Sequence, residues 1–490
     1  MNTKFIPLLI LIFSAGSCKK FVDLQAPDTS LDATQVFQND VSATATINVI
    51  LAEMASEPIL VQGYQGVSVV TGLTGDELLT LSTMQDYLTL VTNNVLPNNG
   101  ILKTIWGKAY LHIYRVNATI AGVQASTGIT EPVRKQLLGE ARFLRAFCYF
   151  YLVNLFGPVP VVTSTNYETN RLAPRQAVNL VYDQIIADLK EAQSLLPASY
   201  LSGSNSTTTA RIRPNKWAAT ALLSRVYLYT QDWAKAEAQA SSVIGQPTYS
   251  LDANLNTVFK SSAKEAIWQL PPVKNASGNT LFVFDGSHFS TEYLRSNGLA
   301  PFSFSYDISD YLNPALAASF EPGDKRKQNW LDSSTDGNKY YHLPFKYKNY
   351  LYTTSCQADH LAVLRLAEQY LLRAEARARQ SNFAGAATDI NLVRARAGLG
   401  AIALSSMTEA LAALEQERRV ELFMEGGHRW LDLKRWPGRN NPAISRAEEI
   451  MAVYAPTKGA VWSKDWLLYP IPQIEVKNGP NITQNPGYPQ

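Results

Sequence analysis

The chain has 490 residues, of which 46% are hydrophobic and 17% charged, and its formal net charge is +3. This composition excludes an intrinsically disordered chain, which would be poorer in apolar residues and more highly charged. The small basic excess argues against a nucleic-acid binder, and three cysteines cannot build a disulfide-rich scaffold.

The first seventeen residues are predicted to be a signal peptide. Lys4 supplies a positive charge, residues 5–13 form an almost continuous apolar run, and small residues lead to Cys18. That run is shorter than the about 20 residues that span a bilayer, and small residues ending on a cysteine are similar to a bacterial lipobox. We therefore expect Cys18 to be the lipidated first residue of the mature chain, followed by a tether over residues 18–39. The alternative is ordinary secretion with an incidental cysteine.

Helical periodicity then recurs along the body of the chain and predicts a mainly α fold. The predicted helices are Asp40–Met54, Trp106–Val123, Pro132–Phe156, Ala177–Leu196, Asn215–Thr230, Trp233–Ile244, Leu361–Gln380, Phe383–Ala397 and Thr408–Gly426. Cys148 falls inside an apolar helical run, where a buried thiol is the usual state. Cys356 lies in a polar stretch, and nothing in the sequence argues that it pairs with Cys148.

Two of these helix pairs share a pattern. A short polar turn is followed by an aromatic residue and, three positions later, by alanine: Trp233 and Ala236 in one pair, Phe383 and Ala386 in the other. A small residue lets two helices approach closely, and the aromatic ring fills the space beside it. The pattern resembles a tetratricopeptide helix pair, although Arg373 and Arg377 replace the large apolar residues of that repeat.

Between the two pairs the composition changes. Residues 281–352 hold 16 aromatic residues in 72 positions, over twice the chain average of 10%, and proline and glycine interrupt them. No helix of normal length fits this stretch, so we expect a large irregular insertion over residues 251–360. Loops on a rigid scaffold commonly carry binding, although most of these rings must pack together.

Three further segments are distinctive in their residue order. Residues 139–150 read GEARFLRAFCYF and run into LFGPVP, and residues 417–436 read ERRVELFMEGGHRWLDLKRW. Residues 468–473 read LYPIPQ, and residues 481–488 read NITQNPGY. With the lead-in to Cys18, these segments resemble the SusD/RagB family of nutrient-uptake outer-membrane lipoproteins over essentially the whole chain. Gly426-Gly427 before His428 departs from the single glycine or Gly-x pair of many members.

The resemblance implies a tetratricopeptide-like helical scaffold, a SusD-like α-α superhelix, with a loop-rich insertion. It also implies one unit over residues 40–490, made of an N-terminal part (40–250), the insertion (251–360) and a C-terminal part (361–490). Such proteins bind a nutrient oligomer, most often a glycan, at the outer face of the outer membrane. They deliver it to a TonB-dependent transporter of the SusC type in polysaccharide utilisation, and they catalyse no reaction.

The charged residues of the motifs have two interpretations. Glu425, His428 and Asp432 have the chemistry of an acid/base group or part of a metal site. The favoured interpretation is a structural ion-pair network around a helix end closed by glycine. It assigns a scaffold role to Arg142, Arg145, Glu421, Glu425, His428, Arg429, Trp430 and Asp432. No cofactor is predicted, and the calcium that some relatives bind has no acidic run of EF-hand spacing here.

Candidate ligand residues come from the polar stretch before the Trp106 helix and from the aromatic insertion. Sugar rings stack on aromatic faces, while polar side chains meet their hydroxyls. The candidates are Asp76, Glu77, Tyr87, Asn94, Tyr293, Arg295, Tyr306, Trp330 and Tyr340. Trp330 stands out because charged and polar residues precede it.

Other functions remain open at this stage. A glycosidase needs paired acidic residues on a catalytic fold, and the sequence holds no nucleophile elbow, P-loop or zinc-binding helix motif. The stronger alternatives are a protein-interaction scaffold of an outer-membrane complex without direct ligand binding, and an uptake lid that binds peptides.

Overall fold

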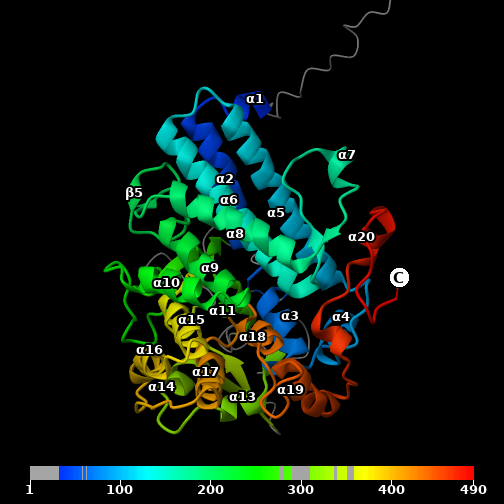
Figure 1. The fold of residues 1–490 in the computed structure, drawn as a ribbon, viewed down its shortest axis with the longest axis vertical. Helices are drawn as coiled ribbons and strands as arrows, with labels where there is room; N and C mark the ends of the chain where they lie inside the picture. Colours follow the sequence, from blue (N-terminus) through cyan, green and yellow to red (C-terminus); the bar gives the residue numbers. More distant parts are fainter. Residues whose placement is uncertain are drawn as a thin grey trace, which may run out of the picture.

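The computed structural model describes residues 33–57, 59–61, 63, 65–274, 281–289, 310–335, 339–349 and 358–489. The chain is mainly helical, as the periodicity predicted, and its strands are short and paired in twos (Figure 1). The predicted signal peptide and Cys18 lie outside the described residues, as do Cys356 and all of the tether before residue 33.

The N-terminal half contains most of the long helices. They are α1 (Ala33–Val36), α2 (Asp40–Ser56), α3 (Val67–Thr74), α4 (Gln85–Val91), α5 (Gly100–Ala125), α6 (Glu131–Phe156), α7 (Tyr167–Asn170), α8 (Val178–Leu195), α9 (Lys216–Tyr229) and α10 (Trp233–Ile244). The strands among them are β1 (Leu78–Thr80), β2 (Val159–Pro160), β3 (Arg175–Gln176), β4 (Tyr200–Leu201) and β5 (Thr207–Thr208).

The C-terminal half begins with short elements and returns to helices. The strands are β6 (Ala266–Leu270), β7 (Val273–Lys274), β8 (Leu281–Phe282), β9 (Asp310–Leu312), β10 (Leu331–Thr335), β11 (Tyr340–Pro344) and β12 (Leu361–Arg365). The helices are α11 (Phe284–His288), α13 (Pro314–Ala318), α14 (Lys325–Trp330), α15 (Leu366–Arg379), α16 (Phe383–Arg396), α17 (Met407–Glu421), α18 (His428–Arg435), α19 (Arg446–Tyr454), η2 (Ala455–Lys458), η3 (Lys464–Leu467) and α20 (Gln473–Asn478).

Local chemistry explains where the helices begin and end. The Asn99 side chain accepts from the first free amides of α5, which therefore starts six residues before the predicted Trp106. Asn215 caps α9 in the same way. Gly157 ends α6 in a left-handed conformation, with φ 74°.

Two predicted helices differ from the structure. The helix expected over Leu361–Gln380 begins only at Leu366, because the five residues before it form the buried strand β12. The helix expected to reach Gly426 ends at Glu421. Met424, Gly426 and Gly427 take positive φ there, and three left-handed residues cannot continue a right-handed helix. The same turn starts α18, which the periodicity did not predict.

Successive helices pack side by side through the molecule. The neighbours run α5, α6, α8, α9, α10, α15, α16 and α17, with α2 against α5 and α6. In Figure 1, α1, α2, α5 and α6 occupy one end of the long axis, and α13, α14, α16 and α17 occupy the other. This continuous stack is the scaffold that carries the short strands.

The two tetratricopeptide-like pairs are α9–α10 and α15–α16, and they lie next to each other because α10 packs on α15. Ala236 and Ala386 are fully buried at the two crossings. The arginines that replace apolar residues join the helices by ion pairs. Arg373 binds Asp389 of α16 at 2.7 Å, and Arg377 reaches both Asp389 and α10.

The alternation of proline with apolar residues in the C-terminal segment LYPIPQ predicts an extended tail on the surface, but this tail is partly internal. Tyr469 and Ile471 are buried, and the Tyr469 amide donates to the carbonyl of Leu155 at 2.9 Å. The tail therefore closes over the C-terminal end of α6. Cys148 is buried as expected, and burial raises the pKa of its thiol. Within the described ranges, no helix has both the length and the hydropathy to cross a membrane.

Candidate functional site

Strand pairing joins the two segments that hold the candidate ligand residues. β1 follows Asp76 and Glu77, and it pairs antiparallel with β9 from the aromatic insertion. Leu79 lies opposite Tyr311 in this register, and β11 packs beside β9. The polar stretch before α5 and the aromatic insertion, more than 200 residues apart in the sequence, therefore contribute to one face of the molecule.

We name this surface the tyrosine face and define it by Leu79, Tyr311, Lys339, Tyr340 and Tyr341. The rings of Tyr311 and Tyr341 meet edge to face, with centroids 4.9 Å apart. The Lys339 ammonium lies 5.2 and 5.1 Å from these two ring centroids, which is within the range of a cation–π contact. Tyr340 points the other way along β11 and is 75% exposed. Tyr311 and Tyr341 are buried, so this region offers one exposed ring on the opposite side of β11 from a buried, rigid pair.

The structure corrects the prediction for Trp330. Its ring is 0% exposed, and its Nε1 donates to the carbonyl of Leu255 at 3.0 Å. The Lys346 ammonium lies 4.9 Å from the ring centroid and Phe259 lies 5.6 Å away. Lys325, Lys327 and Gln328 form the exposed side of α14, while Arg326 and the Trp330 ring are buried in the core. A ligand has no access to either face of this ring.

Asp76 and Glu77 also lie inside the molecule, which corrects their assignment as ligand contacts. Asp76 forms a two-point ion pair with Arg429 at 2.8 and 2.7 Å. Burial opposes its ionisation, but Arg429 holds the pKa of this carboxyl below its usual range. Burial and the charge of Asp76 raise the pKa of Glu77 to about 8. These two carboxyls fix the loop before β1 rather than meeting a ligand.

The protonated state of Glu77 leads to a pH-dependent prediction. Between its ordinary value of 4.5 and about 8, folded Glu77 binds a proton that the unfolded chain has released, so this group makes stability fall as pH rises. Glu77→Gln keeps the neutral form. Chemical denaturation should give similar stabilities for the variant and the wild type at pH 5, with the variant gaining about 1 kcal/mol per pH unit towards pH 8. The exposed Glu168→Gln is the control, and parallel curves for Glu77→Gln would contradict this account.

The remaining candidates divide by exposure. Tyr87 is 5% exposed on α4 and packs in the core, which removes it from the surface. Asn94 follows α4 and is exposed. The helix that it follows, α4, packs against β1. Tyr293, Arg295 and Tyr306 lie outside the described residues.

The charged motif residues form buried ion pairs. Arg145 binds Asp188 at 2.6 Å with Arg142 beside it, and Arg429 binds Asp76. Asp432 joins Arg418 and Arg435. Glu421 and Glu425 belong to a larger group, named here the Glu421 network: Glu265, Arg326, Lys346, Arg365, Arg396, Glu417, Glu421 and Glu425.

His428 and Trp430 lie inside α18 and are also buried. Burial and the charge of Arg225 lower the pKa of His428 well below its usual range, so the imidazole is neutral. A neutral, buried ring surrounded by arginines is poorly placed to exchange protons with a substrate. Within the described parts of the chain, no three His, Cys, Asp or Glu side chains are grouped to hold a metal ion.

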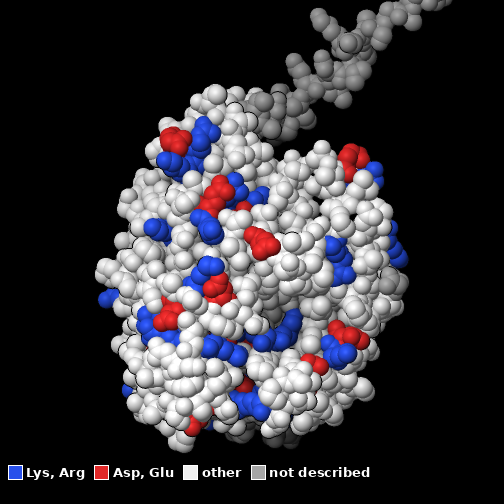
Figure 2. All heavy atoms as spheres, in the orientation of Figure 1, with Lys and Arg blue, Asp and Glu red and all other residues white. Residues whose placement is uncertain are grey.

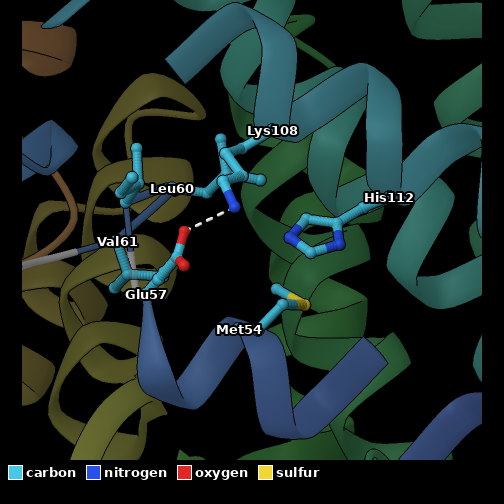
Figure 3. A pocket seen from close by; sticks show the side chains of 7 residues that line it. Met54, Glu57, Leu60, Val61, Lys108 and His112 are labelled. Atoms are coloured by element: carbon cyan, nitrogen blue, oxygen red, sulfur yellow. Dashed lines mark ion pairs between the residues drawn. The ribbon is translucent and has the colours of Figure 1, made fainter. Parts of the chain in front are cut away.

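A small pocket lies between α2 and α5 (Figure 3). It is too narrow to hold a water molecule and is lined by Met54, Glu57, Ile59, Leu60, Val61, Lys108 and His112. Lys108 and Glu57 form an ion pair of 2.5 Å at its edge. Burial lowers the pKa of His112 to about 4. Neither the tyrosine face nor the aromatic insertion contributes a lining residue, so the pocket stands apart from the candidate site.

Sequence reasoning missed Tyr311, one member of the central pair. Tyr311 was one among many insertion aromatics, and nothing in its sequence neighbourhood distinguishes it from a core residue. The alternation of β11, which places Tyr340 outside and Tyr341 inside, is a period-2 signal too short to stand out in a loop-rich segment. The pairing of β1 with β9 is a long-range contact that no local pattern reveals.

Comparison with protein families gives two matches that together span most of the chain. A family described as "Starch-binding associating with outer membrane" matches residues 21–228. A family described as the SusD family matches residues 313–488.

Curated relatives and solved structures agree with these matches. A SusD-like protein of Formosa agariphila is 27% identical, with 80% of this chain and 81% of the relative covered. A laminarin-binding SusD-like protein has a similar structure, with a TM-score of 0.73 at 23% identity over 92% of this chain and 100% of the other. Surface glycan-binding protein A from Bacteroides uniformis gives a TM-score of 0.73 at 21% identity, covering 91% and 98% of the two chains.

Proposed function

Because this chain belongs to the SusD-like family, we propose that it is an outer-membrane lipoprotein that binds a nutrient glycan and passes it to a SusC-like transporter. Proteins of this family bind ligands and catalyse no reaction, and this chain is a binding protein rather than an enzyme. Its relatives include a protein described as laminarin-binding and two described as surface glycan-binding proteins. These descriptions support a carbohydrate cargo.

The tyrosine face is the observation that carries the proposal on the molecule itself. A pyranose ring presents a C–H face that packs on an aromatic ring, and its hydroxyls need polar partners at the edge. Tyr340 offers an exposed ring, and the neighbouring Tyr311 and Tyr341 form a rigid support for its strand. Asn94, which is exposed and follows α4, carries an amide that can donate and accept. Each contact is modest, so the face suits capture and release of an oligomer.

Removing the exposed ring should weaken glycan binding without affecting the fold. Tyr340→Ala should reduce affinity for an oligosaccharide that the wild type binds by about 3- to 10-fold, which is the effect of losing one stacking contact. Tyr167→Ala is a matched control, because Tyr167 on α7 is 73% exposed and lies outside the tyrosine face. Affinity gels over a panel of plant, fungal and host glycans, followed by calorimetry on the best ligand, measure both variants.

The outcomes separate the alternatives. Equal losses in the two variants would contradict the tyrosine face as the site. Retention by peptides but by no glycan would favour a peptide-binding lid. If no glycan or peptide retards the protein, an interaction scaffold without direct ligand binding is favoured. A pull-down from native membranes would then be expected to recover its partner, a large β-barrel.

The lipid anchor has its own test. Cys18→Ala should move the protein from the outer-membrane fraction to the soluble periplasmic fraction, because a lipobox cysteine carries the acyl chains that hold the chain to the bilayer. Fractionation with metabolic labelling by a palmitate analogue measures this change. Cys148→Ala, which removes a buried thiol, is the control that should keep the label.

A further inference from the structure

The hairpin formed by β10 and β11 has an inner and an outer side. Tyr341 and Leu343 of β11 pack with Tyr311 in a small core cluster, so their side of the strand faces into the molecule. Because side chains alternate along a strand, Tyr340 and His342 lie together on the outer side, where Tyr340 is exposed and His342 half-buried. Residues two positions apart are about 7 Å apart along a strand. The imidazole is therefore the neighbour of the exposed tyrosine ring.

Strand β10 adds hydroxyl groups to the same side. The antiparallel register places Ser333 directly opposite His342 and Thr335 directly opposite Tyr340, and side chains that lie opposite each other share one face of the sheet. Oγ of Ser333 lies 2.9 Å from Nδ1 of His342, which is a hydrogen bond between two side chains. We name these four residues the outer hairpin face.

The hydrogen bond to Ser333 leaves the other ring nitrogen of His342 available. Within the described chain, the hydrogen bonding of the imidazole is confined to Nδ1, and Nε2 is not among the buried atoms. Burial and the charge of Lys327 lower the pKa of His342, so the ring is neutral at pH 7. In a neutral imidazole one nitrogen donates and the other accepts, and a sugar hydroxyl is a suitable partner for Nε2 in either state.

Charge has a small part on this surface. None of the four residues of the outer hairpin face is charged at neutral pH, and on the face of the molecule shown in Figure 2 acidic and basic side chains are interspersed over a mostly uncharged surface. The outer hairpin face offers ring stacking and hydrogen bonds instead. These are the two interactions by which proteins hold an uncharged carbohydrate.

We propose that His342 is a second cargo-contacting residue, whose Nε2 forms a hydrogen bond with a hydroxyl of the sugar unit next to the one stacked on Tyr340. Ser333 is a positioning residue, because its hydrogen bond to Nδ1 fixes the orientation of the ring. The spacing of the two rings along β11 is comparable with the length of one sugar unit, so the face contacts two adjacent units. This inference rests on the proposed glycan function and adds a residue and a direction to its site.

Calorimetry with the oligosaccharide that binds the wild type most tightly in the glycan panel tests both roles. His342→Ala should reduce affinity about 2- to 10-fold, which corresponds to one hydrogen bond. His342→Gln keeps a donor and an acceptor and should lose less. Ser333→Ala should also weaken binding, whereas Ser333→Thr keeps the hydroxyl and should restore it. Ser204→Ala is the matched control, because Ser204 is exposed in the β4–β5 turn and pairs with Ser202 at 3.0 Å.

Nuclear magnetic resonance of the histidine rings gives a readout that a purely structural role would not change. The chain has five histidines, and His342→Gln identifies the signal of His342 by its loss. Adding the same oligosaccharide should shift this signal and leave those of the buried His112 and His428 in place.

The outcomes distinguish this inference from the function on which it rests. Weaker binding by Tyr340→Ala, together with normal binding by His342→Ala and an unmoved His342 signal, would overturn the role of His342 and leave the proposed function intact. Losses as small in Ser333→Ala as in Ser204→Ala would overturn the positioning role. If no glycan of the panel binds the wild type, the proposed function and this inference both fail.

Discussion

Arg365→Ala should destabilise the protein by about 3–5 kcal/mol, the usual cost of leaving buried carboxylates without their partner. Arg365 is 2% exposed and binds Glu265 at 3.0 Å, Glu421 at 2.6 Å and Glu425 at 2.6 Å. Burial opposes the ionisation of Glu421, but Arg396, Arg365 and Arg326 together hold its pKa well below the usual range. Losing Arg365 removes one of the charges on which this ionised state depends.

Equilibrium unfolding in urea measures this effect, and two variants calibrate it. Arg171→Ala breaks an ion pair of 2.7 Å whose side chains are 45% and 72% exposed, and it should cost at most about 1 kcal/mol. Arg365→Lys keeps the charge but loses the two-point contact with Glu425, so an intermediate loss is expected. Equal effects for Arg365→Ala and Arg171→Ala would show that the Glu421 network does not support the fold.

Trp330→Ala should reduce stability by about 3–5 kcal/mol, as large-to-small changes in a core do. The ring contacts Phe259, and the Lys346 ammonium lies over its face in a cation–π contact. Its N–H donates to the carbonyl of Leu255. Its truncation leaves a cavity under α14 and takes away one wall of the site that holds the Lys346 ammonium. Trp330→Phe keeps an aromatic ring and should lose less, chiefly the hydrogen bond.

The comparison with Tyr340→Ala makes the Trp330 prediction specific. Tyr340→Ala should leave the unfolding midpoint unchanged and weaken ligand binding, whereas Trp330→Ala should lower the midpoint. Measured well below its unfolding temperature, Trp330→Ala should bind ligand like the wild type. A Trp330→Ala protein with normal stability and lost affinity would contradict the buried position of this ring.

Local patterns predicted the helices well because their determinants are local. Trp233–Ile244 has the predicted bounds, since Asp232 caps its start and Gly245 follows its end. Periodicity failed at Leu361–Arg365, where a short apolar run suits a buried strand and a buried helix equally. These residues form a strand because β6 pairs with them, and β6 lies more than 90 positions earlier in the sequence.

Site residues were harder to predict than helices for the same reason. Asp76, Glu77 and Trp330 look exposed when only their sequence neighbours are considered. Asp76 is nevertheless paired with Arg429, and Trp330 donates to Leu255, and both partners come from distant segments. Charged residues are buried only when paired, and the pairs here join residues up to 353 positions apart. Composition indicated where aromatic side chains are concentrated, but only the strand alternation of β11 separates Tyr340 from its neighbours.

The pairing of β6 with β12 has a consequence for how such a protein diversifies. The two strands lie side by side, so the segment between them leaves the scaffold and returns to it one strand spacing away. Closing a loop costs free energy that grows only slowly with loop length. The parts of residues 271–360 outside the buried contacts of Arg326, Trp330 and Lys346 can thus vary in length while β6 and β12 keep their pairing. A new cargo preference can arise in those parts while the buried contacts continue to hold the insertion on the helices.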